Sequence, residues 1–353
     1  MKTFARAVLG VALLASSARA ITGAESVELR LSAKAGTRVV HAFVLDRSLV
    51  AQKLVTRTGG EEQRSQDEIE VGGRTTLKFT DEIREVVGAR ATLFRRVLDE
   101  AAVHVDMRRS IGGVASRPVT LDGNSPLAAA GVLFRWIESR AEYGRLYDGH
   151  ETSEEFLPRL EADLGLGGFL PRKSVAVGDR WDVDPVRARE LFAFGGSVPV
   201  RFAKGSDPLL ARTTSFGVAG PLDAALGAAA GGRIGAELVG VAGGIARIAL
   251  QFELRCEADQ TARNAERLTP TEQYDGVVVQ SASSTWTFRG EGELRWSVAQ
   301  GCAERLTVSG AETVRLTFAL GGPTGISGSD FELAGGLKLS LDTVVSETTS
   351  TPR

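Results

Sequence analysis

The densest group of residues able to do acid–base chemistry is acidic. Asp179, Asp182 and Asp184 flank Trp181 within the segment Ser174–Pro185. Carboxylates placed close together can serve as general acid and general base in hydrolysis. The same residues also suit a structural role, in which Asp179 belongs to a turn and Asp184 caps a following helix. Both interpretations stay open at this stage, and these three acids are the candidate residues of a hydrolase.

The three histidines, His41, His104 and His150, do not fall at metal-ligand spacing on one element. His41 and His104 lie in strand-like runs, where a histidine faces solvent or finds its hydrogen bonds within the sheet. His150 is followed by acids that would place oxygens around a cation, but a solvated loop that opens a helix, with acids near its positive end, is the simpler explanation. These acids are Glu151, Glu154 and Glu155. The sequence therefore predicts no catalytic, cofactor-binding or metal-binding residue.

Two cysteines, Cys256 and Cys302, form a candidate disulfide. In an exported protein they meet an oxidising compartment, where a bond between them is allowed. Closing a loop of this length would stabilise the protein by about 4 kcal/mol on the chain-entropy estimate. Two free thiols, one buried in a strand and one in a turn, are the alternative.

The first twenty residues have the composition of a secretory signal peptide. Lys2 and Arg6 precede an apolar run that ends in small residues, so we expect cleavage between Ala20 and Ile21. No cysteine lies near this point to accept a lipid anchor, and no later apolar run is long enough for a transmembrane helix. We therefore expect an exported protein, periplasmic or extracellular, that is soluble and is not a lipoprotein.

Charge and composition exclude further classes of function. The leader contains three of the 42 basic residues and no acid, so the remaining chain carries 39 basic and 44 acidic residues. This mild acidity argues against nucleic acid as a partner, because phosphate binding needs a basic face. An aromatic content of 6% also disfavours an outer-membrane barrel, which needs aromatic girdles.

Period-two alternation in the last third of the chain predicts half-buried strands. Apolar residues occupy the even positions of 286–298, and the pattern resumes over 306–320 after the turn-like Gln300-Gly301, which indicates a long antiparallel hairpin. Gly290 and Gly292 lie on the apolar side and predict a bend or a bulge.

Other segments are strand-like as well. A second hairpin joins 234–241 to 248–256, and 331–345 is predicted to form a final hairpin around Gly335-Gly336 before a disordered tail, 346–353. The remaining strand-like segments are 27–31, 39–44 and 75–79.

Helical signals are confined to the middle of the chain. A capping box at Thr152 predicts a helix that ends at Gly165, although Pro158 favours a start near Leu157. A shorter helix is expected after the N-cap pair Asp184-Pro185. Its predicted core-facing residues are Val186, Leu191, and Phe192 or Phe194.

A series of short motifs between Ser125 and Pro185 resembles a group of uncharacterised exported bacterial β-rich proteins. The motifs are Val-Leu-Phe-Arg-Trp, Tyr-x-Arg-x-Tyr-Asp-Gly, Asp-Leu-Gly-Leu-Gly-Gly-Phe-Leu-Pro and Val-Ala-Val-Gly-Asp-Arg-Trp-Asp-Val-Asp-Pro, with Phe-Arg-Gly-Glu-Gly-Glu-Leu-Arg-Trp further on. The resemblance implies no activity, ligand or catalytic residue. Cys256 and Cys302 depart from the group's pattern.

The resemblance bears on the segment 86–101, whose apolar spacing taken alone fits an amphipathic helix. In similar sequences the matching stretch reads as strand, turn and strand, with the turn at Gly88-Ala89-Arg90. Helix and hairpin remain open here, with the resemblance favouring the hairpin.

Together these patterns predict a mainly β protein of antiparallel curved sheets, a sandwich or an open barrel, with two or three short helices in the middle. One β-rich part, 21–170, is expected to end in a short helix, and a second, 171–345, to consist of long hairpins.

The predicted function is that of a non-catalytic extracytoplasmic protein. It binds an apolar or envelope-derived ligand in a concavity of its sheets or contributes to the cell envelope. The alternative is a secreted hydrolase with an acidic site. No cofactor is predicted, and the partner is otherwise unknown.

Overall fold

A computed structural model describes residues 26–65, 67–149, 154–162, 166–202, 230–262, 265, 278–322 and 325–347. The predicted cleavage point at Ala20 and Ile21, the cation-site candidate His150 and most of the tail lie outside these residues.

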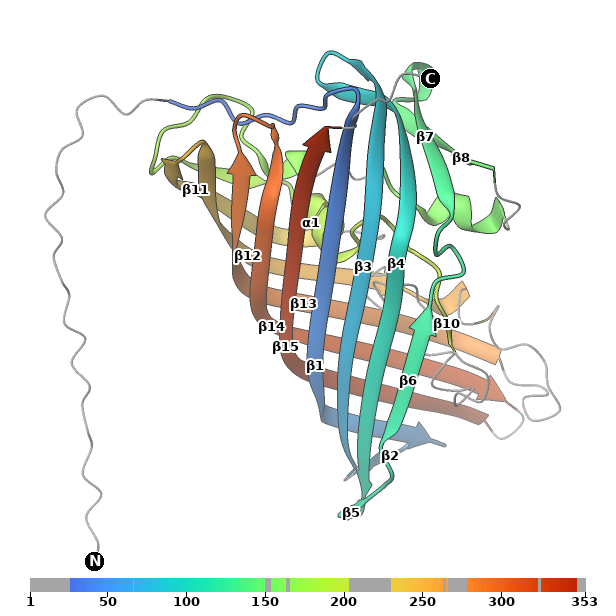
Figure 1. The fold of residues 1–353 in the computed structure, drawn as a ribbon. Helices are drawn as coiled ribbons and strands as arrows, with labels where there is room; N and C mark the ends of the chain where they lie inside the picture. Colours follow the sequence, from blue (N-terminus) through green and yellow to red (C-terminus); the bar gives the residue numbers. More distant parts are fainter. Residues whose placement is uncertain are drawn as a thin grey trace, which may run out of the picture.

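The described strands belong to one antiparallel sheet of fifteen members. They are β1 (Thr37–Thr58), β2 (Glu61–Arg64), β3 (Glu68–Val87), β4 (Arg90–Ile111), β5 (Val114–Ala115), β6 (Val119–Asn124), β7 (Gly131–Ile137), β8 (Glu142–Tyr147), β9 (Arg180–Val183), β10 (Arg201–Phe202), β11 (Ala230–Ala242), β12 (Ile245–Asp259), β13 (Val278–Ser297), β14 (Cys302–Gly322) and β15 (Gly325–Glu347). The main path runs β10-β6-β4-β3-β1-β15-β14-β13-β12-β11-β9. Its two ends do not pair with each other, so the sheet is open. Figure 1 shows that the sheet is strongly curved.

The N-terminal and C-terminal strands share this sheet because β1 pairs with β15 from Thr37 opposite Glu347 to Thr58 opposite Ser327. The two β-rich parts expected from the sequence are therefore joined by continuous strand pairing. The mainly antiparallel, curved character of the sheet is confirmed, and its form is one open sheet.

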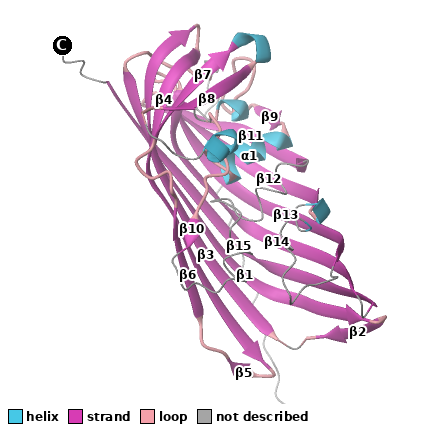
Figure 2. Cartoon of the chain, turned by 90° about the vertical axis from the view of Figure 1, so that its right-hand side faces the viewer, coloured by secondary structure: helices cyan, strands magenta, loops and turns pink. Residues whose placement is uncertain are grey.

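Short helical segments lie near one end of the sheet (Figure 2). They are the 3₁₀ turns η1 (Glu138–Arg140), η2 (Glu154–Arg159), η3 (Gly167–Phe169) and η4 (Pro185–Arg187), and the helix α1 (Ala188–Phe192). Pro158 lies inside η2, which is a 3₁₀ turn where the sequence predicted a helix. Since proline lacks the amide proton of an α-helical bond, it opposes a longer helix here.

The helix predicted after Asp184-Pro185 is present. The Asp184 carboxylate accepts a 3.0 Å hydrogen bond from the backbone amide of Val186. Leu191, Phe192 and Phe194 are buried as expected. Val186 was predicted to face the core, but its side chain is exposed, because it belongs to the 3₁₀ turn and not to the α-helical repeat.

The core lies between the inner face of the sheet and these helical segments. Phe192 contacts the rings of Trp286 and Phe288 edge-on, each at 5.2 Å between centroids. Phe194 stacks against Phe79 at 5.4 Å and Phe43 at 5.9 Å. Aromatic contacts from both halves of the sheet therefore meet on one short segment of chain.

Most of the predicted hairpins are confirmed. β13 and β14 pair around the turn at Gln300-Gly301, and β11 pairs with β12. The segment 86–101 is a hairpin, in which β3 ends at Val87 and β4 begins at Arg90. Register shifts between Ile83 and Val86, and at Lys78/Phe79 opposite Leu98 and Glu100, interrupt the regular strand alternation on both sides of this hairpin.

The hairpin predicted within 331–345 is wrong, because β15 continues through Gly335-Gly336 without a turn. A Cβ atom on Gly335 would lie 1.8 Å from the carbonyl oxygen of Ser48. Glycine is therefore needed for close approach of β1 and β15. The predicted tail also begins too early, since Ser346 and Glu347 pair with Arg38 and Thr37.

Candidate functional site

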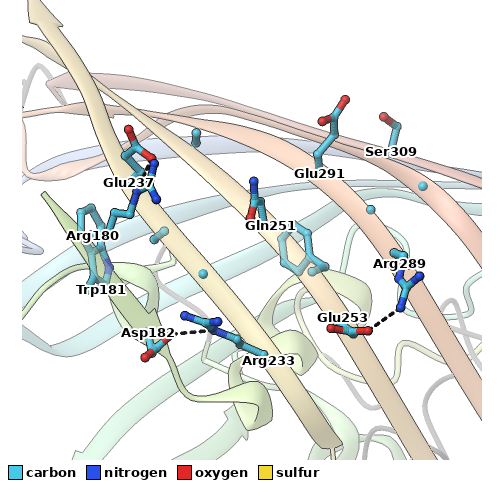
Figure 3. Close-up of a pocket in the computed structure, with 16 residues that line it drawn as sticks. Arg180, Trp181, Asp182, Arg233, Glu237, Gln251, Glu253, Arg289, Glu291 and Ser309 are labelled. Carbon is cyan, nitrogen blue, oxygen red and sulfur yellow. Dashed lines mark hydrogen bonds and ion pairs between the residues drawn. The ribbon is translucent and has the colours of Figure 1, made fainter. Parts of the chain in front are cut away.

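A trough of about 830 Å³, lined by described residues, lies on the outer face of the sheet, opposite the core (Figure 3). Its lining residues come from β9, β11, β12, β13 and β14. Their side chains alternate along each strand with core residues such as Ile234, Phe252 and Phe288, which places them on the opposite face.

The floor of the trough is a single cross-strand row. Strand pairing places five residues side by side, namely Asp182, Gly235, Gln251, Glu291 and Ser309. Neighbouring strands lie about 4.8 Å apart, so the row is about 19 Å long. We call these five residues the floor row.

Of the three glycines in the lining, Gly235 removes a side chain from the floor of the trough, whereas Gly290 and Gly310 lie in the alternation of the inner face, where a Cβ would point towards the core. A Cβ on Gly290 or Gly310 would meet the ring of Phe288 at 2.5 to 2.8 Å, so this buried ring packs against the bare backbone of both glycines. The predicted bulge is not at Gly290, because the register shifts in β13 lie at Val279/Ser281 and Arg295/Trp296.

Two charged rows form the walls of the trough. They lie two residues to either side of the floor row and are therefore about 13 Å apart. One wall consists of Arg233, Glu253 and Arg289, and the other of Arg180, Glu237 and Ala249.

Each guanidinium of the walls is held by a carboxylate. Arg180 donates to Glu237 at 2.7 Å, and Arg233 donates to Asp182 of the floor row at 2.9 Å. Arg289 donates to Glu253 (Figure 3). The members of these pairs are mostly exposed to solvent, so each pair contributes little to stability. Their effect at the site is to neutralise the three arginines.

Three floor residues are left for a ligand. The side chains of Gln251, Glu291 and Ser309 form no hydrogen bond or ion pair with another described residue. They place an amide, a carboxylate and a hydroxyl on adjacent strands. Sequence patterns identified these positions only as the polar side of strands, because the register that aligns them is not visible in the chain order.

The three acids of the hydrolase hypothesis have separate local roles. The Asp179 carboxylate accepts from the amide of Ala176 at 2.9 Å within the turn, and Asp184 caps η4. Only Asp182 lines the trough, where it binds Arg233. The structure does not gather the three acids into one site.

His41 lies in a buried polar cluster on the inner face. Its Nδ1 is 3.2 Å from the hydroxyl of Thr343, and its Nε2 is 3.8 Å from Asp81. Asp81 accepts two 2.7 Å hydrogen bonds from Arg96, and Arg96 also donates to the backbone carbonyl of Glu161 at 2.7 Å. This cluster anchors the segment after η2 to the sheet.

The electrostatics of the cluster do not suit catalysis. Burial first, and then the positive charge of Arg96, together lower the pKa of His41 to about 3. Burial also raises the pKa of Asp81, against the opposing effect of Arg96. An imidazole with so low a pKa is a poor general base near neutral pH. His41 is therefore a hydrogen-bonded histidine within the sheet, as expected.

His104 faces solvent. Its Nδ1 is 2.7 Å from Asp122 and its Nε2 is 2.9 Å from Asp106. Hydrogen bonds to these carboxylates, first Asp122 and then Asp106, raise the pKa of His104. Among the described residues, no group of three or more His, Cys, Asp and Glu side chains is arranged to hold a metal ion.

Both cysteines are free thiols in the structure. Cys256 lies opposite Trp286, whereas Cys302 lies opposite Ser297, and these positions are about 36 Å apart along β13. A disulfide needs Cα atoms within about 7 Å, so the candidate bond does not form in this fold. The observed arrangement is one buried thiol in a strand and one beside a turn.

Cavities on the inner face are much smaller than the trough. One of about 140 Å³ lies beside His41 and Asp81 under the N-terminal segment, and one of about 20 Å³ lies among Leu77, Phe79 and Leu98. Sites for small ligands usually enclose about 300–1,000 Å³. Of these three cavities, the trough has this size.

No protein-family model matches the chain, and no curated protein matches it in sequence. Among solved structures, the outer membrane protein OprG from Pseudomonas aeruginosa aligns with 89% of this chain and 99% of its own, at 7% identity and a TM-score of 0.26. An outer membrane channel from Pseudomonas putida F1 aligns with 89% of this chain and 98% of its own, at 7% identity and a TM-score of 0.21. TM-scores this low carry no argument about function.

Among the described helices, none has the length and apolar character required to cross a membrane.

Proposed function

We propose that this chain is an exported, non-catalytic binding protein whose envelope-derived ligand lies in the trough. The observation that carries the proposal is the row of Gln251, Glu291 and Ser309, three unpartnered polar side chains in the floor of an 830 Å³ cavity. Export is the expectation from the N-terminal twenty residues.

The polarity of the two faces supports water contact at the trough. Arg247 and Glu293 form an exposed ion pair on the outer face, as do Arg305 and Asp342. Leu294, Leu306 and Leu341 lie on the inner face and are buried. A ligand reaching the trough therefore meets a hydrated, charged surface.

The sequence predicts an apolar or envelope-derived ligand, and the cavities favour an envelope-derived ligand that is polar. The apolar inner face near α1 is occupied by the protein's own side chains, including Leu191, Phe192 and Phe194. The two inner cavities, one beside His41 and Asp81 and one among Leu77, Phe79 and Leu98, are too small for a lipid chain of ordinary length. The trough presents charged and amide groups, which an apolar ligand would leave unsatisfied.

The proposal is tested by capturing a ligand from the compartment to which the protein is exported. The purified protein is incubated with an extract of the cell envelope, and native mass spectrometry measures added mass. We expect an adduct in the wild type that is lost in Gly235→Trp, because the new ring fills the floor of the trough.

Gly240→Trp is the matched control. Both glycines lie on β11, both are half-buried, and a Cβ at either meets no atom within 4 Å. Gly240 does not line the trough. Adduct formation that persists in Gly235→Trp, or the absence of any adduct from envelope extracts, would overturn the proposal.

A further inference from the structure

We infer that the ligand of the trough is a neutral, hydroxyl-rich chain, that is, an oligosaccharide that lies across the strands along the floor row. This inference rests on the proposed function and specifies the chemical class of its ligand. The evidence is the kind of free group on the floor, the neutralisation of the walls and the dimensions of the cavity.

The free groups of the floor match the hydrogen bonding of sugar hydroxyls. The Glu291 carboxylate is an acceptor, the Gln251 amide both donates and accepts, and the Ser309 hydroxyl does the same. A sugar hydroxyl is likewise a donor and an acceptor. Hydroxyls on successive rings of one chain can therefore satisfy all three side chains.

The charge of the trough opposes anionic ligands. Its lining contains three arginines, Arg180, Arg233 and Arg289, and each already binds a carboxylate. The lining also contains four carboxylates, which are Asp182, Glu237, Glu253 and Glu291. No arginine is left to bind a phosphate or a uronic acid, and Glu291 would repel either.

A strongly cationic ligand is also disfavoured. Glu291 is the one lining carboxylate without a basic partner among the described residues, so a polyamine would find one counter-charge across the floor. Gln251 and Ser309 add hydrogen bonding without charge. This combination favours neutral hydroxyls over several amino groups.

The shape of the trough suits an extended chain. The floor row is about 19 Å long and the walls are about 13 Å apart, so the cavity is longer than it is wide. Gly235 leaves the β11 position of the floor open, with no atom within 4 Å of a Cβ built there. An extended oligosaccharide can therefore follow the floor row from β14 toward β9 and cross bare backbone at Gly235.

The experiment uses a printed array of neutral, acidic and amino-bearing oligosaccharides, followed by titration calorimetry with the tightest soluble binder. We expect neutral oligosaccharides to bind and acidic ones not to bind. Glu291→Gln is expected to weaken binding at least about tenfold, because a hydrogen bond to a charged group contributes about 1.5–3 kcal/mol. Gly235→Trp should abolish binding, whereas Gly240→Trp should retain it.

A matched control for the charge is Glu100→Gln. Glu100 is an exposed carboxylate on β4, outside the trough, so its replacement should leave the affinity unchanged. Thermal unfolding of each variant confirms that the fold is kept, which is expected because Glu291 is exposed and glutamine has nearly the same shape.

The outcomes separate this inference from the proposed function. Preference for acidic oligosaccharides, or affinity that Glu291→Gln leaves unchanged, would overturn the oligosaccharide assignment. An envelope adduct that is lost in Gly235→Trp but proves to be a peptide or a polyamine would overturn it as well, while leaving the proposed binding function standing. Failure of every envelope component to bind the trough would overturn both.

Discussion

Arg47 on β1 and Glu312 on β14 form a two-pronged ion pair that crosses over the strand between them, β15. The Arg47 Nε and Nη2 atoms donate to Glu312 at 2.8 and 2.7 Å. Trp286 donates to the same carboxylate at 2.9 Å. Gly335 of β15 lies directly opposite Glu312 and has no side chain to obstruct this contact. The pair therefore links strands from the two ends of the chain.

Removing one partner of this pair should strongly destabilise the protein. The Glu312 side chain is fully buried and that of Arg47 is 14% exposed, so Arg47→Ala leaves a buried, unpaired carboxylate. We expect a loss of about 3–5 kcal/mol in the free energy of unfolding, measured by urea denaturation.

The double variant Arg47→Met/Glu312→Leu is the control for burial of charge. It should lose less than Arg47→Ala alone, because no uncompensated charge remains in the core. A double variant less stable than the single one would show that the ion pair is not the source of the loss.

The two adjacent glycines of β15 should differ sharply in their tolerance of a methyl group. A Cβ on Gly335 would lie 1.8 Å from the Ser48 carbonyl oxygen, whereas a Cβ on Gly336 has its nearest contact at 4.0 Å. We expect Gly335→Ala to lower the free energy of unfolding by about 1–3 kcal/mol or more. Gly336→Ala should change it by less than about 0.5 kcal/mol. Equal effects in thermal or urea unfolding would contradict the close approach of β1 and β15.

His41 should make the protein less stable in mild acid. Its pKa is about 3 in the folded protein and about 6.5 in an unfolded chain, so the unfolded state takes up a proton first as pH falls. The stabilising contribution of neutral His41 is complete above pH 6.5 and is lost progressively down to about pH 3. The loss is at most about 1.4 kcal/mol per pH unit.

The measurement compares the unfolding free energy of wild type and His41→Gln between pH 7 and 4.5. As pH falls, the wild type should lose more unfolding free energy than the variant, so any stability advantage of the wild type should shrink. His104→Gln should show the opposite pH dependence. The raised pKa of His104 stabilises the fold at low pH, and this contribution disappears as pH rises, so the stability lost in His104→Gln should be largest at low pH. A difference that is constant over this range would refute the assignment for His41.

The cysteines should remain reduced in the exported protein. Burial raises the pKa of both thiols to about 11, with Glu304 contributing at Cys302, so both should react slowly with alkylating reagents in the native state. After denaturation without reductant, both should be alkylated, and mass spectrometry should count two labels. A single species with no label would show a disulfide and contradict the strand register.

Local features of the fold were predictable from the sequence because they depend on near neighbours. The alternation of 286–298 and 306–320 determines a hairpin, and Asp184-Pro185 determines where a short helix begins. These patterns arise from strand pleating and end capping, which act over a few residues.

Glycine was the main source of error. Gly335-Gly336 has the composition of a turn, yet these residues lie inside a strand because β1 approaches β15 closely at Gly335. Turn formation and close packing of two backbones both favour glycine. Only the position of the neighbouring strand distinguishes between them.

The sequence by itself determined most of the long strands and the polar and apolar side of each. Tertiary structure decided which strands are neighbours and in what register. Register aligned Gln251, Glu291 and Ser309 into one floor and placed Cys256 far from Cys302. The physical reason is that strand pairing joins residues distant in the chain through backbone hydrogen bonds, which are the same for every side chain and leave no local pattern in the sequence.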